Sequence, residues 1–173
     1  KQDYKKAFEW YEKAANQGIA KAQHNLGVMY ERGQGVKQDY KKAFEWYEKS
    51  AIQGIANAQH NLGVMYSNGK GVKQDYKKAI EWYEKAATQG YVDAQYNLGL
   101  MYYNGQGVRQ DYKKAFEWFE KAATQGVAKA QYNLGLMYLN GLGVKQDYKK
   151  AFEWFEKAAT QGYVDAQYNL GLM

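Results

Sequence analysis

The chain has 173 residues, 46% of them hydrophobic and 24% charged, and its formal net charge is +6 at pH 7. It contains no cysteine, which excludes disulfide bonds and thiolate metal sites, and no proline, which suits a mostly helical chain. No apolar run approaches the roughly 20 residues of a membrane-spanning helix, and no signal-peptide pattern opens the chain. Because the sequence starts at Lys1 and stops at Met173 within a repeated pattern, we expect a fragment of a longer array. Cytoplasmic, periplasmic and secreted locations all stay open.

The phrase QDYKKA recurs along the chain every 36 residues. Its copies begin at Gln2, Gln38, Gln74, Gln110 and Gln146. A period between about 20 and about 50 residues is typical of stacked structural units, so the sequence indicates a repeat array in place of one globular domain.

Two helices are predicted in each unit, and the first complete copy illustrates them. The first helix is predicted over residues 22–33, where the apolar stripe consists of Ala22, Leu26, Met29 and Tyr30. The second helix is predicted over residues 39–54, where the stripe consists of Tyr40, Ala43, Phe44, Tyr47 and Ala51, with Trp46 beside it. Glu45 and Lys49 have the spacing of a helical ion pair.

The joint between the helices reads GQGVKQD, from Gly33 to Asp39, and recurs in three further copies. Glycine-rich turns that enter a helix hold phosphate in many proteins. A phosphate loop would occur once, however, and Asp39 would repel an anion at the helix N-terminus. We therefore predict a structural corner. Gly33 ends the first helix, Gly35 makes a turn that is closed to other residues, Val36 packs beneath the corner, Asp39 caps the second helix and Gly54 ends it.

One such hairpin cannot bury both of its apolar faces, whereas three or more stacked hairpins can. Ala22, Gly27 and Ala43 are small where neighbouring helices must approach closely. The predicted fold is therefore all-α: a right-handed α/α solenoid, or superhelix, of antiparallel helix hairpins with a 36-residue period.

The recurring pattern A…NLG.MY..G.GV.QDY.KA.EW.EKAA.QG resembles the Sel-one-like repeat (SLR), a branch of the tetratricopeptide superfamily. The residues that match the tetratricopeptide pattern are Leu98, Gly99, Tyr102, Ala115, Phe119 and Ala122. The loop NGQGV, two residues longer than a tetratricopeptide turn, distinguishes the SLR type.

The resemblance covers the whole chain and implies one SLR solenoid domain over residues 1–173. Its parts would be a lone second helix (1–18, helical from residue 3), four full repeats (19–54, 55–90, 91–126 and 127–162) and a lone first helix (163–173). The resemblance also implies a non-enzymatic scaffold or adaptor that binds proteins without a cofactor. It does not identify the partner.

Comparison of the copies within the chain separates two kinds of surface. The second helices are nearly identical, whereas the first helices differ at the positions that residues 21, 24, 28, 31 and 32 occupy in the first complete copy. This spacing places the differing positions on one side of the helix, which we call the variable face. Packing faces need the same residue in every copy, so we expect the variable face to be exposed. By the resemblance, it would line a concave groove that suits a peptide or protein. An exposed face that drifted without selection is the alternative.

The candidate protein-binding residues comprise this face together with an invariant asparagine beside it. They are Lys21, His24, Asn25, Val28, Asn57, His60, Asn61, Val64, Asp93, Tyr96, Asn97, Leu100, Tyr103, Asn104, Lys129, Tyr132, Asn133, Leu136, Leu139, Asn140 and Tyr168. The asparagine, which recurs as Asn169, could hold a peptide backbone. The favoured alternative is that it bonds neighbouring helices.

Nucleic acid is disfavoured as a partner, despite the net charge. The variable face carries equal numbers of basic and acidic residues: Lys21, Arg32 and Lys129 against Glu31, Asp93 and Asp165. The basic excess lies on the second helices, in the paired lysines from Lys5–Lys6 to Lys149–Lys150, which we interpret as a solvated back face.

An enzyme is disfavoured as well. His24 and His60 occupy equivalent positions but have no third metal ligand in the sequence, so no metal site is predicted. SNGK (67–70) matches a penicillin-recognition motif, but it falls where a helix should end. The tryptophans, constant in every copy, are interpreted as packing residues.

We therefore expect a non-enzymatic scaffold that binds a peptide or protein in a concave groove, without cofactor, metal or membrane span. A consensus-like or designed array with no selected ligand is the first alternative, and a basic surface that binds nucleic acid is the second. The uncapped first and last helices also suggest head-to-tail self-association.

Overall fold

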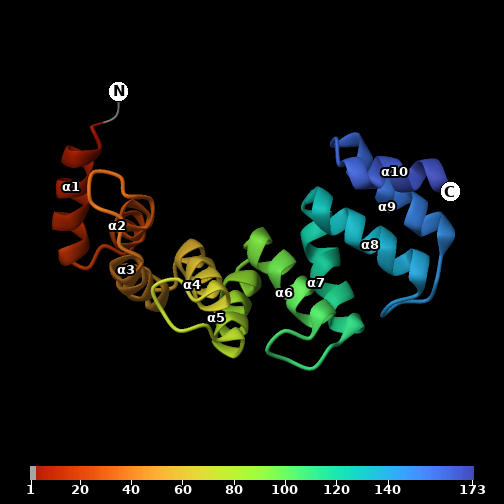
Figure 1. Ribbon diagram of the computed structural model, residues 1–173, viewed down its shortest axis with the longest axis horizontal. Helices are drawn as coiled ribbons and strands as arrows, with labels where there is room; N and C mark the ends of the chain where they lie inside the picture. The colour runs from red at the N-terminus through yellow and green to blue at the C-terminus, as the bar shows by residue number, and fades with distance from the viewer. Residues whose placement is uncertain (1–2) are drawn as a thin grey trace. The chain divides into compact units, whose positions relative to one another are not determined.

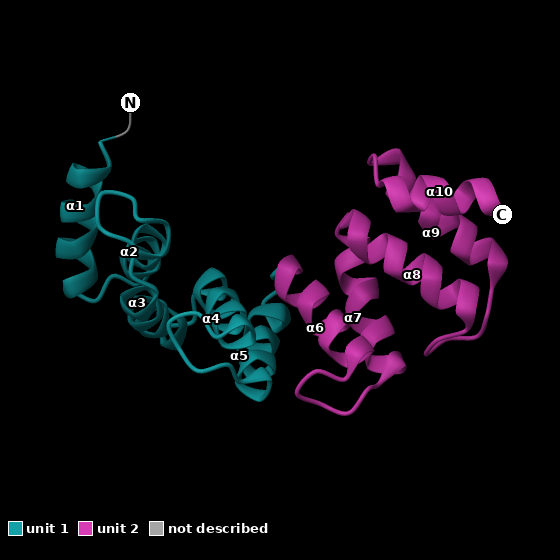
Figure 2. Ribbon diagram, viewed as in Figure 1, with its two compact units in different colours: residues 1–91 teal, residues 92–173 magenta. Residues whose placement is uncertain are grey.

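The computed structural model describes residues 3–173, which form ten α-helices and no strand (Figure 1). Gln2, which begins the first QDYKKA copy, lies outside the described residues. The chain divides into two compact units, residues 1–91 and residues 92–173, which Figure 2 shows in different colours.

The helices of both units are short and nearly uniform in length. Unit 1 contains α1 (Tyr4–Asn16), α2 (Ala20–Arg32), α3 (Tyr40–Ile52), α4 (Ala56–Asn68) and α5 (Tyr76–Thr88). Unit 2 contains α6 (Val92–Asn104), α7 (Tyr112–Thr124), α8 (Ala128–Asn140), α9 (Tyr148–Thr160) and α10 (Val164–Leu172). The predicted first and second helices are confirmed, with boundaries shifted by one or two residues.

The shift has a local cause at each end. α2 begins at Ala20, two residues earlier than predicted, because the carbonyl of Ile19 already accepts a hydrogen bond from the amide of Gln23 at 3.0 Å. α3 ends at Ile52 because Gly54 has a φ of +92°, which a continuing helix cannot accommodate.

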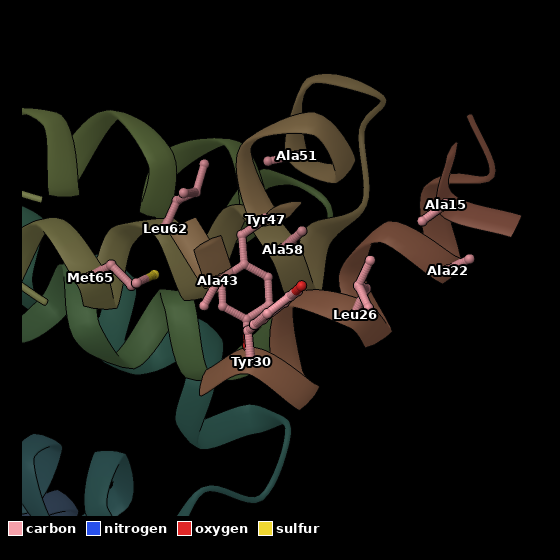
Figure 3. Packing of buried hydrophobic residues seen from close by; sticks show 10 residues of the cluster. All are labelled: Ala15, Ala22, Leu26, Tyr30, Ala43, Tyr47, Ala51, Ala58, Leu62 and Met65. Carbon is pink, nitrogen blue, oxygen red and sulfur yellow. The ribbon is translucent and has the colours of Figure 1, made fainter. Parts of the chain in front are cut away.

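Within each unit, every helix packs against the helices that precede and follow it in the chain. This is the arrangement of stacked hairpins, and it confirms the predicted all-α solenoid type. The cluster in Figure 3 gathers side chains from α1 to α4, among them the fully buried Leu26, Tyr47 and Leu62. The predicted stripe of the first helix is buried throughout. In the second helix, Tyr40 and Phe44 are half-buried because they lie at the edge of the cluster.

The first and second helices of a hairpin meet at a glycine. A Cβ atom at Gly27 would lie 2.6 Å from Cδ1 of Tyr47, and one at Gly63 would lie 2.5 Å from Cδ1 of Tyr83. Any side chain larger than hydrogen would push the aromatic ring away. The predicted close approach at Gly27 is therefore confirmed.

The GQGVKQD joint is a structural corner, as predicted. Gly33 is left-handed (φ +67°) and ends α2, and Gly35 is also left-handed (φ +73°). Val36 packs against the core cluster. The carboxylate of Asp39 accepts a hydrogen bond from the amide of Lys42 at 3.0 Å and so caps α3.

The second glycine of each joint also touches the neighbouring hairpin. At Gly71 (φ +70°), a Cβ atom would overlap the carbonyl oxygen of Tyr40 at the start of α3, whereas nothing lies within 4 Å of one at Gly54 (φ +92°). We expect Gly54→Ala to lower the free energy of unfolding by about 1–2 kcal/mol, the cost of a left-handed alanine. Gly71→Ala should lower it further, because the loop must also move away from α3.

Urea denaturation of both variants and the parent protein measures this difference. Equal losses for the two variants would mean that the loop does not depend on close contact with the preceding hairpin.

Candidate interaction surface

The variable face lies outside the core in each first helix, α2, α4, α6, α8 and α10. Every residue on it is exposed or half-buried. The invariant Leu26 and Met29, on the other side of α2, are buried, as are their counterparts in α4, α6 and α8. The prediction that packing positions and varying positions occupy different sides of the first helix is confirmed. That the variable face binds a protein stays a prediction.

In each full repeat, a ring of the variable face packs at a tilt against a ring of the second helix. One ring comes from the first helix and is half-buried, and the other comes from the second helix and is buried above the helical glycine. The pairs are His24–Tyr47, His60–Tyr83, Tyr96–Phe119 and Tyr132–Phe155, with ring centroids 5.7, 5.7, 5.8 and 5.6 Å apart. Where the first helix carries histidine, the second carries tyrosine. Where the first carries tyrosine, the second carries phenylalanine.

This exchange changes which ring presents a hydroxyl group. The hydroxyl of Tyr47 donates a hydrogen bond of 2.6 Å to Oε2 of Glu31, at a variable position of the same repeat. Burial, together with this hydrogen bond, raises the pKa of Tyr47 well above its usual range. In the third and fourth repeats the buried ring is phenylalanine, and the hydroxyl belongs to the half-buried Tyr96 or Tyr132 instead.

The invariant asparagine bonds the ring of the preceding repeat. Nδ2 of Asn61 lies 3.3 Å from Nε2 of His24, and Nδ2 of Asn169 donates to the hydroxyl of Tyr132 at 3.4 Å. These bonds join first helices of neighbouring repeats, α2 with α4 and α8 with α10. They support the structural interpretation of the asparagine, which the sequence left open.

His24 is the titratable group at the centre of this network in unit 1. Its Nδ1 lies 3.4 Å from Oδ1 of Asn25, and its Nε2 faces the amide of Asn61, which fits a neutral ring protonated on Nδ1. Burial lowers the pKa of His24, and the Asn25 bond and the Glu31 charge oppose that effect without cancelling it.

A second row of carboxamides went unpredicted. Gln23, Gln59, Gln95 and Gln131 are buried in the first helices. Gln59, for example, donates to the carbonyl of Ala51 at 3.1 Å and accepts from Gln89 at 2.7 Å, so it links the hairpin before it to its own second helix. The signal was present in the sequence, since the glutamine is identical in every copy. A search for apolar stripes does not detect this glutamine, because its side chain is polar.

The basic back face is partly engaged in packing. Lys42 Nζ lies 5.3 Å from the ring centroid of Tyr30, and Lys49 Nζ lies 4.1 Å from that of Trp46. Among the described residues no ion pair joins Glu45 to Lys49, so that prediction is wrong. The ammonium group of Lys49 instead lies over the ring of Trp46, which is half-buried.

The metal and motif candidates of the sequence lie within the described residues. Residues 3–173 contain no group of three histidine or acidic side chains that could hold a metal ion. SNGK begins in the last turn of α4, and its Gly69 ends that helix, as expected for a chance match. None of the helices in the described part of the chain has the length and apolar character that crossing a membrane requires.

Hollows lie on the variable face in both units. One in unit 1, about 470 Å³, is lined by Lys21, His24, Asn25, Gly54, Ile55, Ala56, Asn57 and Gln89. The hollow of unit 2, about 150 Å³, is lined by Leu100, Tyr103, Asn104, Asn133 and Leu136. The first is open and lined by both polar and apolar surface, and the second is mainly apolar.

The lowered pKa of His24 predicts a pH effect on stability. The unfolded chain takes up the His24 proton near the ordinary pKa of 6.5, and the folded chain resists it to lower pH. The free energy of unfolding should therefore fall from about pH 7.5 to about pH 5.5. The double variant His24→Tyr with Tyr47→Phe, which copies the ring pair of the third repeat, should show a shallower fall.

Urea denaturation across this pH range compares the two proteins, and His60 is common to both. Identical slopes would show that the His24 network does not resist protonation.

The Sel1 repeat family matches the chain throughout, with repeats that begin one residue later than the predicted boundaries. The matched segments are residues 1–19, 20–55, 56–91, 92–127, 128–163 and 164–173. No curated protein matches the chain.

Several solved structures are similar. The c5321 protective antigen of uropathogenic Escherichia coli, which displays an SLR fold, is 44% identical with a TM-score of 0.97. A Sel1 repeat protein from Oxalobacter formigenes is 42% identical with a TM-score of 0.90. Both alignments cover 99% of this chain, but only 37% of the first protein and 49% of the second. An immunity protein from Pseudomonas aeruginosa, Pa5087, is 28% identical over 96% of this chain and 61% of that one, with a TM-score of 0.57.

The repeat pattern, the stacked hairpins and these matches agree on one assignment: the chain belongs to the Sel1 repeat family.

Proposed function

We propose that this chain binds a peptide or protein segment over the variable face and acts as a non-enzymatic scaffold. Sel1 repeat proteins are in general protein-interaction scaffolds. The observation that carries the proposal is the division of each first helix into an invariant buried side and a differing exposed side. Since the buried side secures the fold, the exposed side is free to match a partner.

The chemistry of the variable face supports a protein partner. Its tyrosine, histidine and asparagine side chains are well suited to protein recognition, because they combine apolar contact with hydrogen bonding. Tyr96 and Tyr132 pack against buried phenylalanines, so less side-chain entropy is lost when a partner binds.

Nucleic acid has less support as a ligand. The basic excess lies on the second helices, where Lys42, Lys78, Lys114 and Lys150 each cover a tyrosine ring of a first helix. These ammonium groups are partly engaged in packing. An array without a selected ligand is the remaining alternative, and it predicts no specific binding at all.

Binding to a peptide array tests the proposal, with Tyr96, Tyr103 and Tyr132 each changed to Ala. We expect at least one of these changes to weaken binding of the selected peptides by about tenfold or more, because aromatic anchors dominate such interfaces. Lys113→Ala, on the back face, is the control and should change affinity by less than about twofold. Thermal melting confirms that each variant is folded.

Peptides that bind the parent protein and all three tyrosine variants equally well would place recognition elsewhere on the molecule.

Head-to-tail association of two copies is a further part of the proposal. Trp10 on α1 and Tyr168 and Leu172 on α10 are 68%, 67% and 68% exposed, whereas Leu136, the counterpart of Leu172, is half-buried in α8. These apolar side chains face no neighbouring hairpin in the described structure. Light scattering should show a mean mass that rises with concentration. Leu172→Lys should reduce that rise, and a constant monomer mass would contradict self-association.

A further inference from the structure

The smallest hollow of the variable face has a mainly apolar lining. It lies in unit 2, between the helices α6 and α8, and its volume is about 150 Å³. Leu100, Tyr103 and Asn104 line it from α6, and Asn133 and Leu136 line it from α8. We call it the α6–α8 cleft. The cleft belongs wholly to unit 2, in which α7 packs against both α6 and α8.

One wall of the cleft is aromatic, and it lies beside the phenylalanine of the ring pair in the third repeat. Tyr103 packs edge-on against Tyr112, with centroids 5.2 Å apart, and its ring also lies 6.4 Å from that of Phe119. In the first repeat the same position is Glu31, whose carboxylate accepts a hydrogen bond from the hydroxyl of Tyr47. Phe119 has no hydroxyl group that needs a hydrogen-bond acceptor, so an aromatic ring can occupy the position that the carboxylate has in the first repeat.

The lining of the cleft disfavours a charged ligand. Leu100, Tyr103 and Leu136 supply apolar surface, and the two asparagines supply neutral carboxamides. A charged group that entered would lose its hydration without meeting an opposite charge, which costs several kcal/mol. Electrostatic complementarity therefore favours an uncharged occupant.

Size and hydrogen bonding narrow the occupant further. An apolar cavity of about 150 Å³ accepts a group of about the size of benzene. This matches one leucine, methionine or phenylalanine side chain. Asn133 bonds the hydroxyl of Tyr96, and a carboxamide has further donor and acceptor positions for a peptide backbone that passes the cleft.

We infer that the α6–α8 cleft is a specificity pocket, which takes one uncharged apolar side chain of an extended partner segment while Asn104 and Asn133 bond the backbone beside it. This inference rests on the proposed function, because it names the chemistry of the segment that the variable face binds. It commits to a peptide anchor, and it does not depend on how the two units are arranged.

The test begins with a library of random 12-residue peptides panned against the whole chain. Each enriched peptide is then measured against Leu136→Phe, which fills the cleft, and against Ile52→Phe, which adds the same ring at an exposed position of α3. We expect each peptide to carry one Leu, Met or Phe whose change to Ala weakens binding about tenfold or more. Leu136→Phe should cause a similar loss and Ile52→Phe less than about a twofold change.

Three other outcomes are distinguishable. Peptides whose affinity is unchanged by Leu136→Phe but reduced by Tyr132→Ala would contradict the specificity pocket and leave the proposed function supported. Peptides whose single essential residue is charged would also overturn the pocket. No enrichment over an unrelated helical protein would overturn both. If Leu136→Phe does not fold, Leu100→Phe fills the same cleft from α6 and is judged by the same criteria.

Discussion

The structure depends on the contact between a glycine of the first helix and an aromatic ring of the second. Glycine within a helix costs roughly 0.5–1 kcal/mol relative to alanine, yet it occurs there in every full repeat because a Cβ atom would overlap the ring. The ring, Tyr47 in the first full repeat and Phe119 in the third, is fully buried as a result. Burial of one such ring contributes on the order of 2–3 kcal/mol, which offsets the local cost of the glycine.

This contact also sets the chemistry of the exposed side. The buried ring lies directly beneath the half-buried ring of the variable face, so the two must suit each other. Buried tyrosine accompanies histidine on the variable face, and buried phenylalanine accompanies tyrosine there; in the first full repeat, Glu31 accepts a hydrogen bond from the hydroxyl of Tyr47. A change in the buried ring thus accompanies a change in the polar groups of the variable face.

Carboxamides join the hairpins into a stack within each unit. Buried glutamines such as Gln59 satisfy a backbone carbonyl of the preceding hairpin, and Asn61 and Asn169 bond a ring one repeat back. An unsatisfied carboxamide in these places would cost about 1–3 kcal/mol, so the bonds fix the register between repeats as well as stabilise them. These bonds fix the helices that carry the variable face.

The sequence by itself determined the period, the helices, their caps and the corner between them, because these depend on residues within a few positions of one another. Asp39, Gly33 and the apolar stripe of α2 were all predictable on that ground. Only the tertiary structure decided the contacts between different helices: the bond of Asn61 to His24, the burial of the glutamine row and the wall that Tyr103 adds to the α6–α8 cleft. Helical spacing brings both Glu45 and Trp46 within reach of Lys49, and in the structure Lys49 lies over Trp46. Local patterns specify a helix, but they leave open which atoms meet when helices stack, since that depends on the packing distance and register between hairpins.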